Sequence, residues 1–476
     1  HSKDLVNWRL ANYALKEIEP TIFFNAPQHG KGVWAPSIRY HNGEFFIYWG
    51  DPDWGIFMVK TKDPLGEWEK PVLVKAGKGM IDPTPLWDED GKVYLVHAWA
   101  GSRAAFNSVI TVCEMNAGGT KVISEPVLVF DGNDGVNHTI EGPKFYKRNG
   151  YYYILAPAGG VVTGWQLALR SRNVYGPYES KIVMAQGDTD INGPHQGGWV
   201  ETCTGESWFI NFQDKAMYGR VLHLNPVKWE NDWPVIGEDK DGDGCGEPVK
   251  RYKKPDVGRI YPIETPIESD EFNTRQLGLQ WEWHANYQDT FGFTSDLGYI
   301  RIYGHILSKD FVNFWEVPNL LLQKFPAEEF TATAKLKVSA KADGQQSGLI
   351  VMGWDYGYLG VVKEGDKFIL NQVVCKDAEQ RSPETVTHLA ELPVSRRFGA
   401  GLYPNYERDI YLQVKVTGGG ICYFSYSLDG RKYTSAGVPF TARQGKWIGA
   451  KVGLFSTAPY GKERGWVDAD WFRINK

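Results

Sequence analysis

The chain has 476 residues, more than one hydrophobic core usually supports, and this length predicts two domains. Its formal net charge is only −5, and no stripe of Lys and Arg could neutralise a phosphate backbone, so we expect no nucleic-acid partner. No apolar run approaches the ~20 residues that a membrane helix needs, so we expect no membrane partner either.

Aromatic residues and cysteines restrict the class of protein further. The 19 Trp and 25 Tyr suit an all-β protein, and they also suit sugar binding, although aromatic packing within sheets accounts for most of them. The five cysteines form no Cys-x-x-Cys pair, so neither a zinc site nor a dense disulfide framework is indicated. We expect buried free thiols.

The first residues of the chain match segments that come later. Residues 1–8 are similar to residues 60–68 and 170–178, each of which ends a strand-turn-strand repeat. By the same logic, residues 1–8 close a repeat whose earlier strands lie upstream of His1. We therefore expect the first repeat to be incomplete in this chain.

The repeats themselves are a strand, a turn containing Gly and a second strand. They run over residues 34–48, 82–96 and 139–155, with a looser copy at 200–210. A spacing of roughly fifty residues is typical of a β-propeller, in which each repeat is one blade around a central axis. Together with the incomplete first blade, this predicts a five-bladed propeller over residues 1–250. Trp34 occupies the slot of Glu141, and Asp82 lies near that slot, so we expect these positions to converge on the axis.

Two residues near the last blade are candidates for a site. His195 lies in a polar, glycine-rich loop at residues 187–198, a kind of loop that meets ligands at the mouth of a propeller, although a lone His in a loop is more often structural. Arg220 opens a largely apolar strand, and a buried arginine needs a carboxylate or a hydroxyl-rich partner.

The rest of the chain predicts a second domain. Residues 239–244 are similar to the opening of a calcium loop, but Lys250 stands where the closing glutamate should be. Residues 251–268 are charged and contain proline, which indicates a linker. Residues 269–476 alternate apolar and polar side chains in many short segments, which is typical of a β-sandwich.

Asp82 and Glu141 are the candidate catalytic pair. Adjacent inner strands should bring the two carboxylates close together, and like charges held close push one pKa up. That is what a general acid for glycoside cleavage requires. The alternative, equally weighted on spacing alone, is that both residues only cap turns before strands.

Several motifs together carry a resemblance to a known family. They are Trp34-Ala-Pro, Ile81-Asp-Pro, Ile140-Glu-Gly-Pro, Gly193-Pro-His-Gln-Gly197, Tyr218-Gly-Arg220, Asp270-Glu-Phe-Asn273 and Asp470-Trp-Phe472. The series resembles glycoside hydrolase family 43, and more narrowly its β-xylosidases and α-L-arabinofuranosidases with a C-terminal, concanavalin-like β-sandwich. The resemblance runs over nearly the entire chain.

The resemblance implies a five-bladed propeller and an inverting, exo-acting hydrolase. It makes Glu141 the general acid and Asp82 the carboxylate that tunes and orients it. It also implies that His195 lies at the floor of the site, where a calcium-water cluster is often held, that Arg220 contacts sugar hydroxyls, and that Trp34 lines the pocket. No other cofactor is implied, and any calcium would be structural.

The family's general base has no match in this chain. Family members carry that aspartate on the inner strand of the first blade, so we expect it upstream of His1. Asp51, Asp188 and Asp190 could stand in for it, but nothing in their local sequence recommends them. The alternative is a protein that has lost catalysis and only binds carbohydrate; a protein-binding propeller is a weaker third hypothesis.

The substrate class follows from the same resemblance. We expect a xylo- or arabino-configured oligosaccharide or polysaccharide of plant cell walls, without a choice between xylose and arabinose. A polymeric substrate favours a secreted or periplasmic protein, and the sequence leaves the oligomeric state open.

Overall fold

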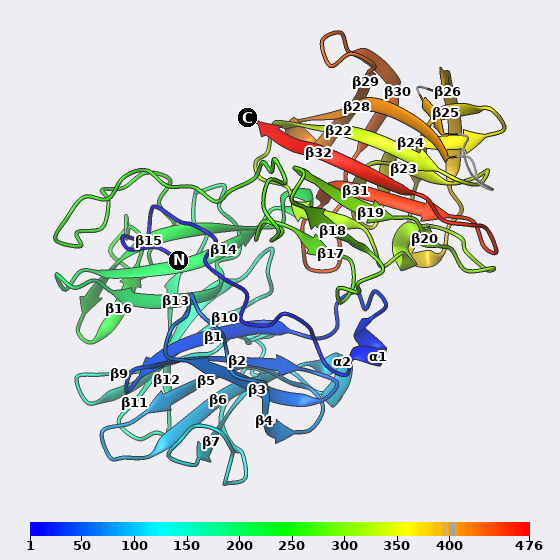
Figure 1. Cartoon of the computed structure of the whole chain (residues 1–476). Helices are drawn as coiled ribbons and strands as arrows, with labels where there is room; N and C mark the ends of the chain where they lie inside the picture. Colours follow the sequence, from blue (N-terminus) through cyan, green and yellow to red (C-terminus); the bar gives the residue numbers. More distant parts are fainter. Residues whose placement is uncertain (395, 399–404) are drawn as a thin grey trace. The chain divides into compact units, whose positions relative to one another are not determined.

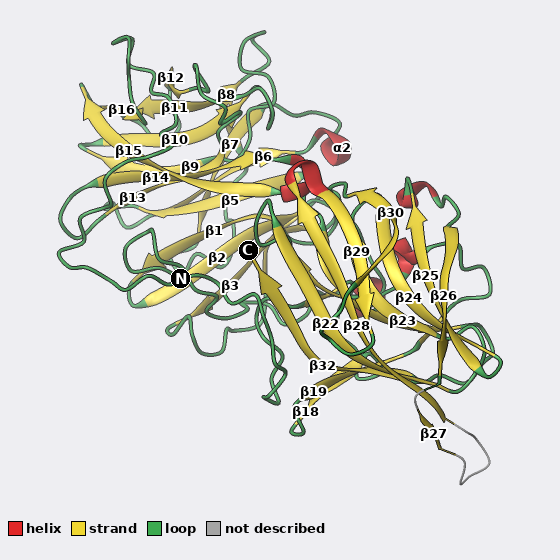
Figure 2. Ribbon diagram, turned by 90° about the horizontal axis from the view of Figure 1, so that it is seen from above, coloured by secondary structure: helices red, strands yellow, loops and turns green. Residues whose placement is uncertain are grey.

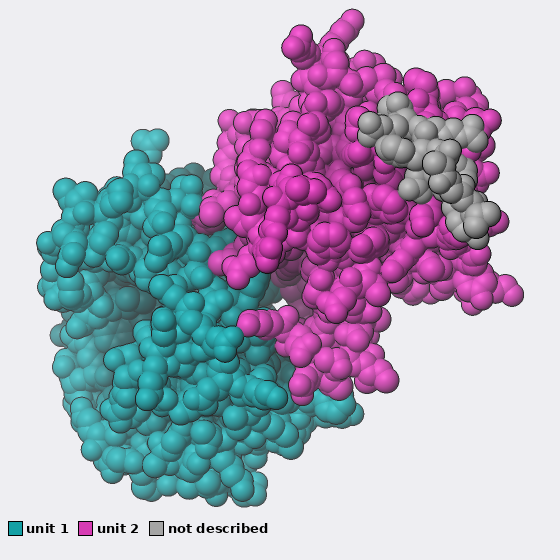
Figure 3. Space-filling model, in the orientation of Figure 1, with its two compact units in different colours: residues 1–15, 31–214, 220–265 teal, residues 16–30, 215–219, 266–476 magenta. Residues whose placement is uncertain are grey.

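The computed structural model describes residues 1–394, 396–398 and 405–476. The chain divides into two compact units, which Figure 3 shows in different colours. The first unit comprises residues 1–15, 31–214 and 220–265, and the second comprises residues 16–30, 215–219 and 266–476. The regular elements of the described residues are mostly strands; their two α-helices, α1 (Thr21–Phe24) and α2 (Gly101–Ala104), are four residues long. None of the helices in these residues is both long and apolar enough to cross a membrane.

The first unit contains four antiparallel four-stranded sheets, each built from consecutive strands (Figure 1). The first sheet has β1 (Trp34–His41), β2 (Glu44–Asp51), β3 (Gly55–Thr61) and β4 (Val72–Ala76); the second has β5 (Met80–Trp87), β6 (Val93–Trp99), β7 (Val109–Met115) and β8 (Val127–Asp131). The third has β9 (Lys144–Arg148), β10 (Tyr151–Ala158), β11 (Trp165–Ser171) and β12 (Glu179–Met184); the fourth has β13 (His195–Glu201), β14 (Ser207–Asp214), β15 (Arg220–Glu230) and β16 (Trp233–Ile236). These sheets are the blades of a β-propeller.

Local sequence explains the hairpins. Asn42-Gly43 between β1 and β2, and Asn149-Gly150 between β9 and β10, all have positive φ, as a two-residue type I′ turn requires. Apolar side chains of successive blades then pack together, for example Ile81, Val96 and Ile110 of the second blade with Ile154 and Leu169 of the third. The second and third blades therefore share a buried cluster, and other clusters join the first blade to the second and the third to the fourth.

Residues 1–8 repeat a turn of the first and third blades. The prediction that this segment ends a blade is wrong, because residues 60–68 and 170–178 run from the end of the third strand of their blades toward the fourth, before β4 and β12. In all three segments a hydroxyl oxygen, of Ser2, Thr61 or Ser171, accepts the N–H of the residue two positions later. The side chain of that residue then accepts another backbone N–H two positions further on. The similarity between these segments is thus one of hydrogen bonding as well as of sequence.

The described residues form four blades, so the prediction of five blades stays a prediction. One feature of the sheets favours it. Ser37 and Arg39 of β1 bond to backbone carbonyls of the second and third blades, whereas Ile38 and Tyr40 on the opposite face are exposed. Leu222 of β15 is exposed as well. Large exposed apolar side chains on a sheet face are typical of a surface that another element covers.

The second unit is a sandwich of two sheets (Figure 2). One contains β17 (Glu282–Trp283), β21 (Leu321–Lys324), β31 (Lys451–Ala458), β23 (Gln346–Met352), β24 (Tyr356–Glu364), β25 (Lys367–Cys375) and β26 (Thr385–Pro393) in spatial order, with β20 (His305–Ile306) beside β31. The other contains β18 (Gly292–Ser295), β19 (Tyr299–Tyr303), β32 (Trp466–Asn475), β22 (Phe330–Ala340), β28 (Asn405–Thr417), β29 (Ile421–Ser427) and β30 (Thr434–Thr441), with β27 (Arg396–Phe398) beside β28.

The core of the sandwich lies between these two sheets. Leu336 and Val414 of one sheet pack in the same buried cluster as Leu349 and Leu454 of the other. Alternate residues of β22 are fully buried, because successive side chains of a strand point to opposite faces. The predicted β-sandwich is confirmed. Residues 251–269 contain no strand, and the boundary between the two units falls between residues 265 and 266.

All five cysteines are free. Cys113, Cys375 and Cys422 are buried, as expected, and Cys245 is partly buried. The expectation is wrong for Cys203, which is exposed. This cysteine lies in the tight turn between β13 and β14, where Thr202 and Glu206 pair and the Cys203 thiol donates to the carbonyl of Val257 at 3.4 Å at the surface.

Candidate active site

The inner strands of the blades share one irregularity, a β-bulge at the start of the strand. Trp34 lies opposite Gly50, Ile81 opposite Ala98 and His195 opposite Phe212, and the pairing register shifts directly after each. In the third blade the N–H of Glu141 donates to the carbonyl of Pro157, the corresponding contact. Trp34, Ile81, Glu141 and His195 therefore hold equivalent positions, and the prediction that Trp34 shares the slot of Glu141 is consistent with this register.

Asp82 follows this position by one residue and lies inside the bulge. Its φ is 56°, and the equivalent residues Gly142 and Gln196 also have positive φ, of 62° and 51°. Such a conformation is costly for a residue other than Gly and is found where a bulge re-aims a side chain, often beside an active site. The bulge explains why Asp82 lies near the slot of Glu141 rather than in it.

The Asp82 carboxylate reaches the neighbouring blade. Its Oδ2 accepts the N–H of Gly142 at 2.7 Å, directly beside Glu141 in the chain, and it also accepts a hydrogen bond from the side chain of Gln196. Asp82 is only 3% exposed. Burial, followed by the nearby charge of Glu141, raises the pKa of Asp82 to about 6. Asp82 is thus the buried member of the pair.

Glu141 is the accessible member. Its side chain is 35% exposed, and its Oε1 lies 2.7 Å from Nε2 of His195. His195 is 1% exposed, begins strand β13, and orients the Glu141 carboxyl group. The sequence placed His195 in a loop and weighed it as more often structural; its contact with Glu141 makes it part of the candidate site. Its Nδ1 is buried and has no protein partner among the described residues.

Lys144 and Gln196 belong to the site but were missed from the sequence. Lys144 is 6% exposed, and its Nζ donates to the carbonyl of Gly142 and to Oε1 of Gln196, both at 3.2 Å. Burial lowers the pKa of Lys144 to about 8, against the opposing charge of Asp82. A chain of hydrogen bonds therefore runs from Lys144 through Gln196 to Asp82. The sequence did contain a signal for Lys144. The equivalent positions of the first two blades, Ser37 and Thr84, are neutral hydroxyl residues, so a lysine at this position is unusual among the repeats.

Arg220 is not the buried arginine expected from the sequence. It is the first residue of β15 and is exposed, and its guanidinium lies 4.6 Å from the centre of the Phe212 ring. The charges of Glu141 and Asp82 act on it, yet surrounding protein atoms lower its pKa. Its exposure and its lowered pKa are compatible, because the side chain lies against Phe212 and still reaches solvent.

Trp34 is half-buried against the cluster that contains Ile81 and Ile140, the residues preceding Asp82 and Glu141. The Arg103 guanidinium lies 5.8 Å from its ring centre. This position supports a role near the two carboxylates. That Trp34 lines the sugar pocket stays a prediction.

The three aspartates considered as substitutes for the general base lie in other surroundings. Asp51 is buried, which raises its pKa to about 6, and the neighbouring charges that act on it are Asp53 and Arg103. Asp188 and Asp190 are exposed around another hollow, where Asp190 pairs with Lys250. These contacts do not direct any of the three toward Glu141.

The sequence indicates two places for calcium, residues 239–244 and the surroundings of His195. Among the described residues, the carboxylates of Asp239, Asp241 and Asp243 come within 4.8 Å of one another, but Lys250 pairs with Asp190 and offers no closing ligand. At His195, Nε2 bonds Glu141 and leaves Nδ1 for an additional partner such as an ion-bound water. The His195 arrangement fits the predicted water-mediated role, which stays a prediction.

Comparisons with known proteins show the family of the chain. A family model described as glycosyl hydrolases family 43 matches residues 1–234, and one described as the beta xylosidase C-terminal concanavalin A-like domain matches residues 269–475. A putative beta-xylosidase of Xylanibacter ruminicola is 36% identical over 96% of this chain and 80% of its own length. A non-reducing end alpha-L-arabinofuranosidase of Bacteroides ovatus is 29% identical over 79% of this chain and 72% of its own length.

Solved structures show the same fold. A family-43 protein of Bacillus licheniformis superposes with a TM-score of 0.81 at 25% identity, covering 100% of this chain and 92% of that one. A xylan beta-1,4-xylosidase of Bacillus halodurans gives a TM-score of 0.83 at 21% identity, with the same coverage. The protein is a glycosidase with a propeller and a β-sandwich. The chain belongs to glycosyl hydrolases family 43.

Proposed function

We propose that this glycosidase is exo-acting and inverting, and that it releases terminal xylose or arabinose from plant cell-wall hemicellulose. The observation that carries the proposal is the unequal pair of carboxyl groups. Glu141 is accessible to a substrate, whereas Asp82 is buried. Asp82 lies on the neighbouring blade, one residue after the position that is equivalent to Glu141, and accepts the N–H of Gly142. Environments that differ in this way assign different roles to two acidic residues.

In this proposal Glu141 is the general acid. Its protonated carboxyl group donates to the glycosidic oxygen as the bond to the anomeric carbon breaks. His195 holds Oε1 and so fixes the direction of the carboxyl group, with the proton on the oxygen that faces the substrate. The exposed guanidinium of Arg220, within electrostatic range of both carboxylates, is placed to donate to sugar hydroxyls.

Asp82 is the orienting and tuning carboxylate. Its bond to the N–H of Gly142 fixes the backbone directly after Glu141 and so sets the direction of that side chain. Lys144 and Gln196 support its ionised form. A calcium ion held through water beside Nδ1 of His195 would supply a fixed positive charge at the floor of the site. No other cofactor is required.

Inversion also needs a general base about 6.5–9.5 Å from the acid, with a water between base and sugar. We assign this base to the fifth blade implied by the family resemblance. The exposed faces of β1 and β15 support the presence of that blade, and the surroundings of Asp51, Asp188 and Asp190 argue against a substitute.

The substrate proposal draws on the relatives' names. One is a putative beta-xylosidase and another an arabinofuranosidase acting at the non-reducing end. The test is to incubate the protein with an aryl β-D-xyloside and an aryl α-L-arabinofuranoside, with Glu141→Gln as the control. Release of phenol that is lost in the variant supports the proposal, and the preferred substrate identifies the sugar. A folded protein that binds both glycosides without cleaving either would instead be a carbohydrate-binding protein.

A further inference from the structure

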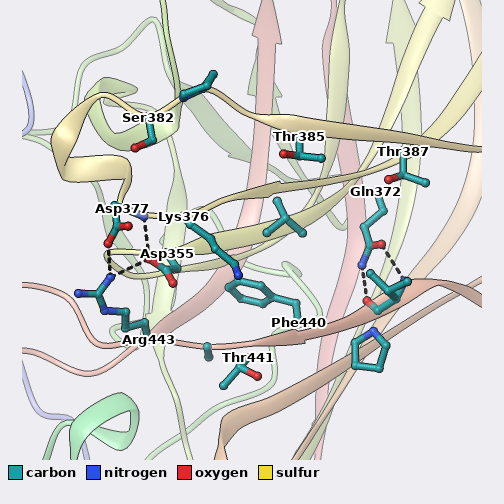
Figure 4. A pocket seen from close by; sticks show the side chains of 15 residues that line it. Asp355, Gln372, Lys376, Asp377, Ser382, Thr385, Thr387, Phe440, Thr441 and Arg443 are labelled. Atoms are coloured by element: carbon teal, nitrogen blue, oxygen red, sulfur yellow. Dashed lines mark hydrogen bonds and ion pairs between the residues drawn. The ribbon is translucent and has the colours of Figure 1, made fainter.

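The β-sandwich carries a groove of about 760 Å³ that belongs to the second unit alone. Strands β25 and β26 of one sheet form its floor, and residues 438–443, the end of the edge strand β30 of the other sheet and the two residues after it, form a wall (Figure 4). Both β26 and β30 are edge strands. The groove is therefore the gap where the two sheets diverge.

The floor of the groove is small and rich in hydroxyl groups. Gln372 lies opposite Thr387, and Val374 opposite Thr385, so these four side chains share one face of the sheet. Thr385 and Thr387 are exposed. On the next strand Gly357 has no side chain, and a Cβ there would come within 2.9 Å of the buried Phe440 ring. An aromatic side chain thus closes the bottom of the groove while the threonine hydroxyls remain available.

The backbone of the β30 wall is already paired. The Gln372 side chain donates to the carbonyl of Val438 at 2.6 Å and accepts its N–H at 2.8 Å. Gly437, with a φ of 71°, permits this approach, since a Cβ would lie 2.0 Å from Oε1 of Gln372. An incoming peptide strand would need these backbone groups for β-sheet pairing. Gln372 occupies them, which disfavours a peptide ligand.

The charges of the groove balance one another. Arg443 pairs with Asp355 at 3.0 Å and with Asp377 at 2.6 Å, and Asp355 also accepts the N–H of Asp377 at 2.8 Å. Lys376 supplies the second positive charge. Two acidic and two basic residues leave no net charge to select an anion or a cation. A neutral ligand with many hydroxyl groups fits this lining.

We propose that this groove binds a segment of neutral glycan, separately from the site in the propeller. Hydroxyls of Thr385 and Thr387 can both donate and accept, as vicinal sugar hydroxyls do, and the exposed Val438 and Pro439 offer an apolar wall to the C–H face of a sugar ring. The inference rests on the proposed function only for the class of ligand. Binding here would hold a polysaccharide near the enzyme without involving Glu141.

The test is affinity electrophoresis of the full chain in native gels that contain soluble xylan or arabinoxylan. Thr385→Val with Thr387→Val removes two hydroxyls while keeping side-chain shape, and we expect affinity to fall about tenfold, the loss typical of two neutral hydrogen bonds. Lys376→Ala, at an exposed position, gives a second variant with little risk to folding. Thr434→Val is the matched control, because Thr434 is exposed on β30 but does not line the groove.

The outcomes separate clearly. Retardation that is weakened by the double variant and unchanged by Thr434→Val supports the groove. Equal retardation of the double variant and the unmodified protein overturns it. If the double variant bound fluorescein-labelled unfolded casein less well than the unmodified protein did, while its retardation by glycan stayed unchanged, the groove would be assigned to peptides instead. Turnover of aryl glycosides, measured on the same samples, tests the proposed function independently, and far-UV circular dichroism shows whether each variant is folded.

Discussion

The Oδ2 atom of Asp82 accepts the backbone N–H of Gly142 at 2.7 Å, the residue that directly follows Glu141. Asp82 lies in the bulge of its blade, and Glu141 lies one position before the bulge of the next. The Asp82 carboxylate is therefore buried against the backbone of the segment that carries Glu141.

Asp82→Asn should lower kcat/KM for aryl glycosides by a factor of about 10² or more, because the orienting charge beside the general acid is lost. The same variant should be more stable at neutral pH. The native pKa of about 6 lies above the unfolded value of 3.8, so the native state binds more protons between these values and stability falls as pH rises from about 4 to 6.

The size of that effect is at most about 3 kcal/mol, from 1.36 kcal/mol for each pKa unit. Urea unfolding at pH 4 and pH 7.5 measures it, and the gain of Asp82→Asn over the unmodified protein should appear mainly at pH 7.5. An equal difference at both pH values would contradict the explanation by burial of the charge.

His195→Asn should reduce kcat about 10- to 100-fold with a smaller change in KM, because the variant loses the bond that directs the Glu141 carboxyl group. Steady-state kinetics with an aryl xyloside or arabinofuranoside measures both constants. A variant that raises KM alone would show that His195 contacts the sugar rather than positioning the acid.

Lys144→Met should move the acidic limb of the pH–rate profile to higher pH. Lys144 favours the ionised form of Asp82, so the pKa of Asp82 rises when the positive charge is removed. The measurement is kcat/KM from pH 4.5 to 8. Lys144→Arg, which keeps the charge, is the control; a profile that moves equally in both variants would point to altered packing.

Gly142→Ala tests the close approach between the third and fourth blades. Gly142 has a φ of 62°, and a Cβ there would lie 2.9 Å from the Gln196 carboxamide. We expect a loss of about 1–3 kcal/mol in stability together with reduced activity. Gly43→Ala is the matched control, since its φ is 85° but nothing lies within 4 Å. Equal losses in the two variants would assign the effect to backbone strain alone.

The sequence by itself determined the blades, the sandwich and the family. Turn residues such as Asn42-Gly43 and alternating strands are local signals, and a repeated Pro-containing strand start identified Glu141 and Asp82. The propeller, the sandwich and the family match these expectations, whereas the count of five blades stays a prediction beside the four described. Such features are readable because backbone conformation and side-chain period depend on neighbouring residues.

Only the tertiary structure decided how the site is assembled. The bulges set which side chains of adjacent blades meet, and they bring Gln196 and Lys144 to Asp82 from positions 114 and 62 residues later in the chain. Arg220 and Cys203 were expected to be buried and are exposed, because neighbours distant in sequence decide what covers a strand start or a turn. Burial and pairing across blades are non-local quantities, so local sequence does not specify them.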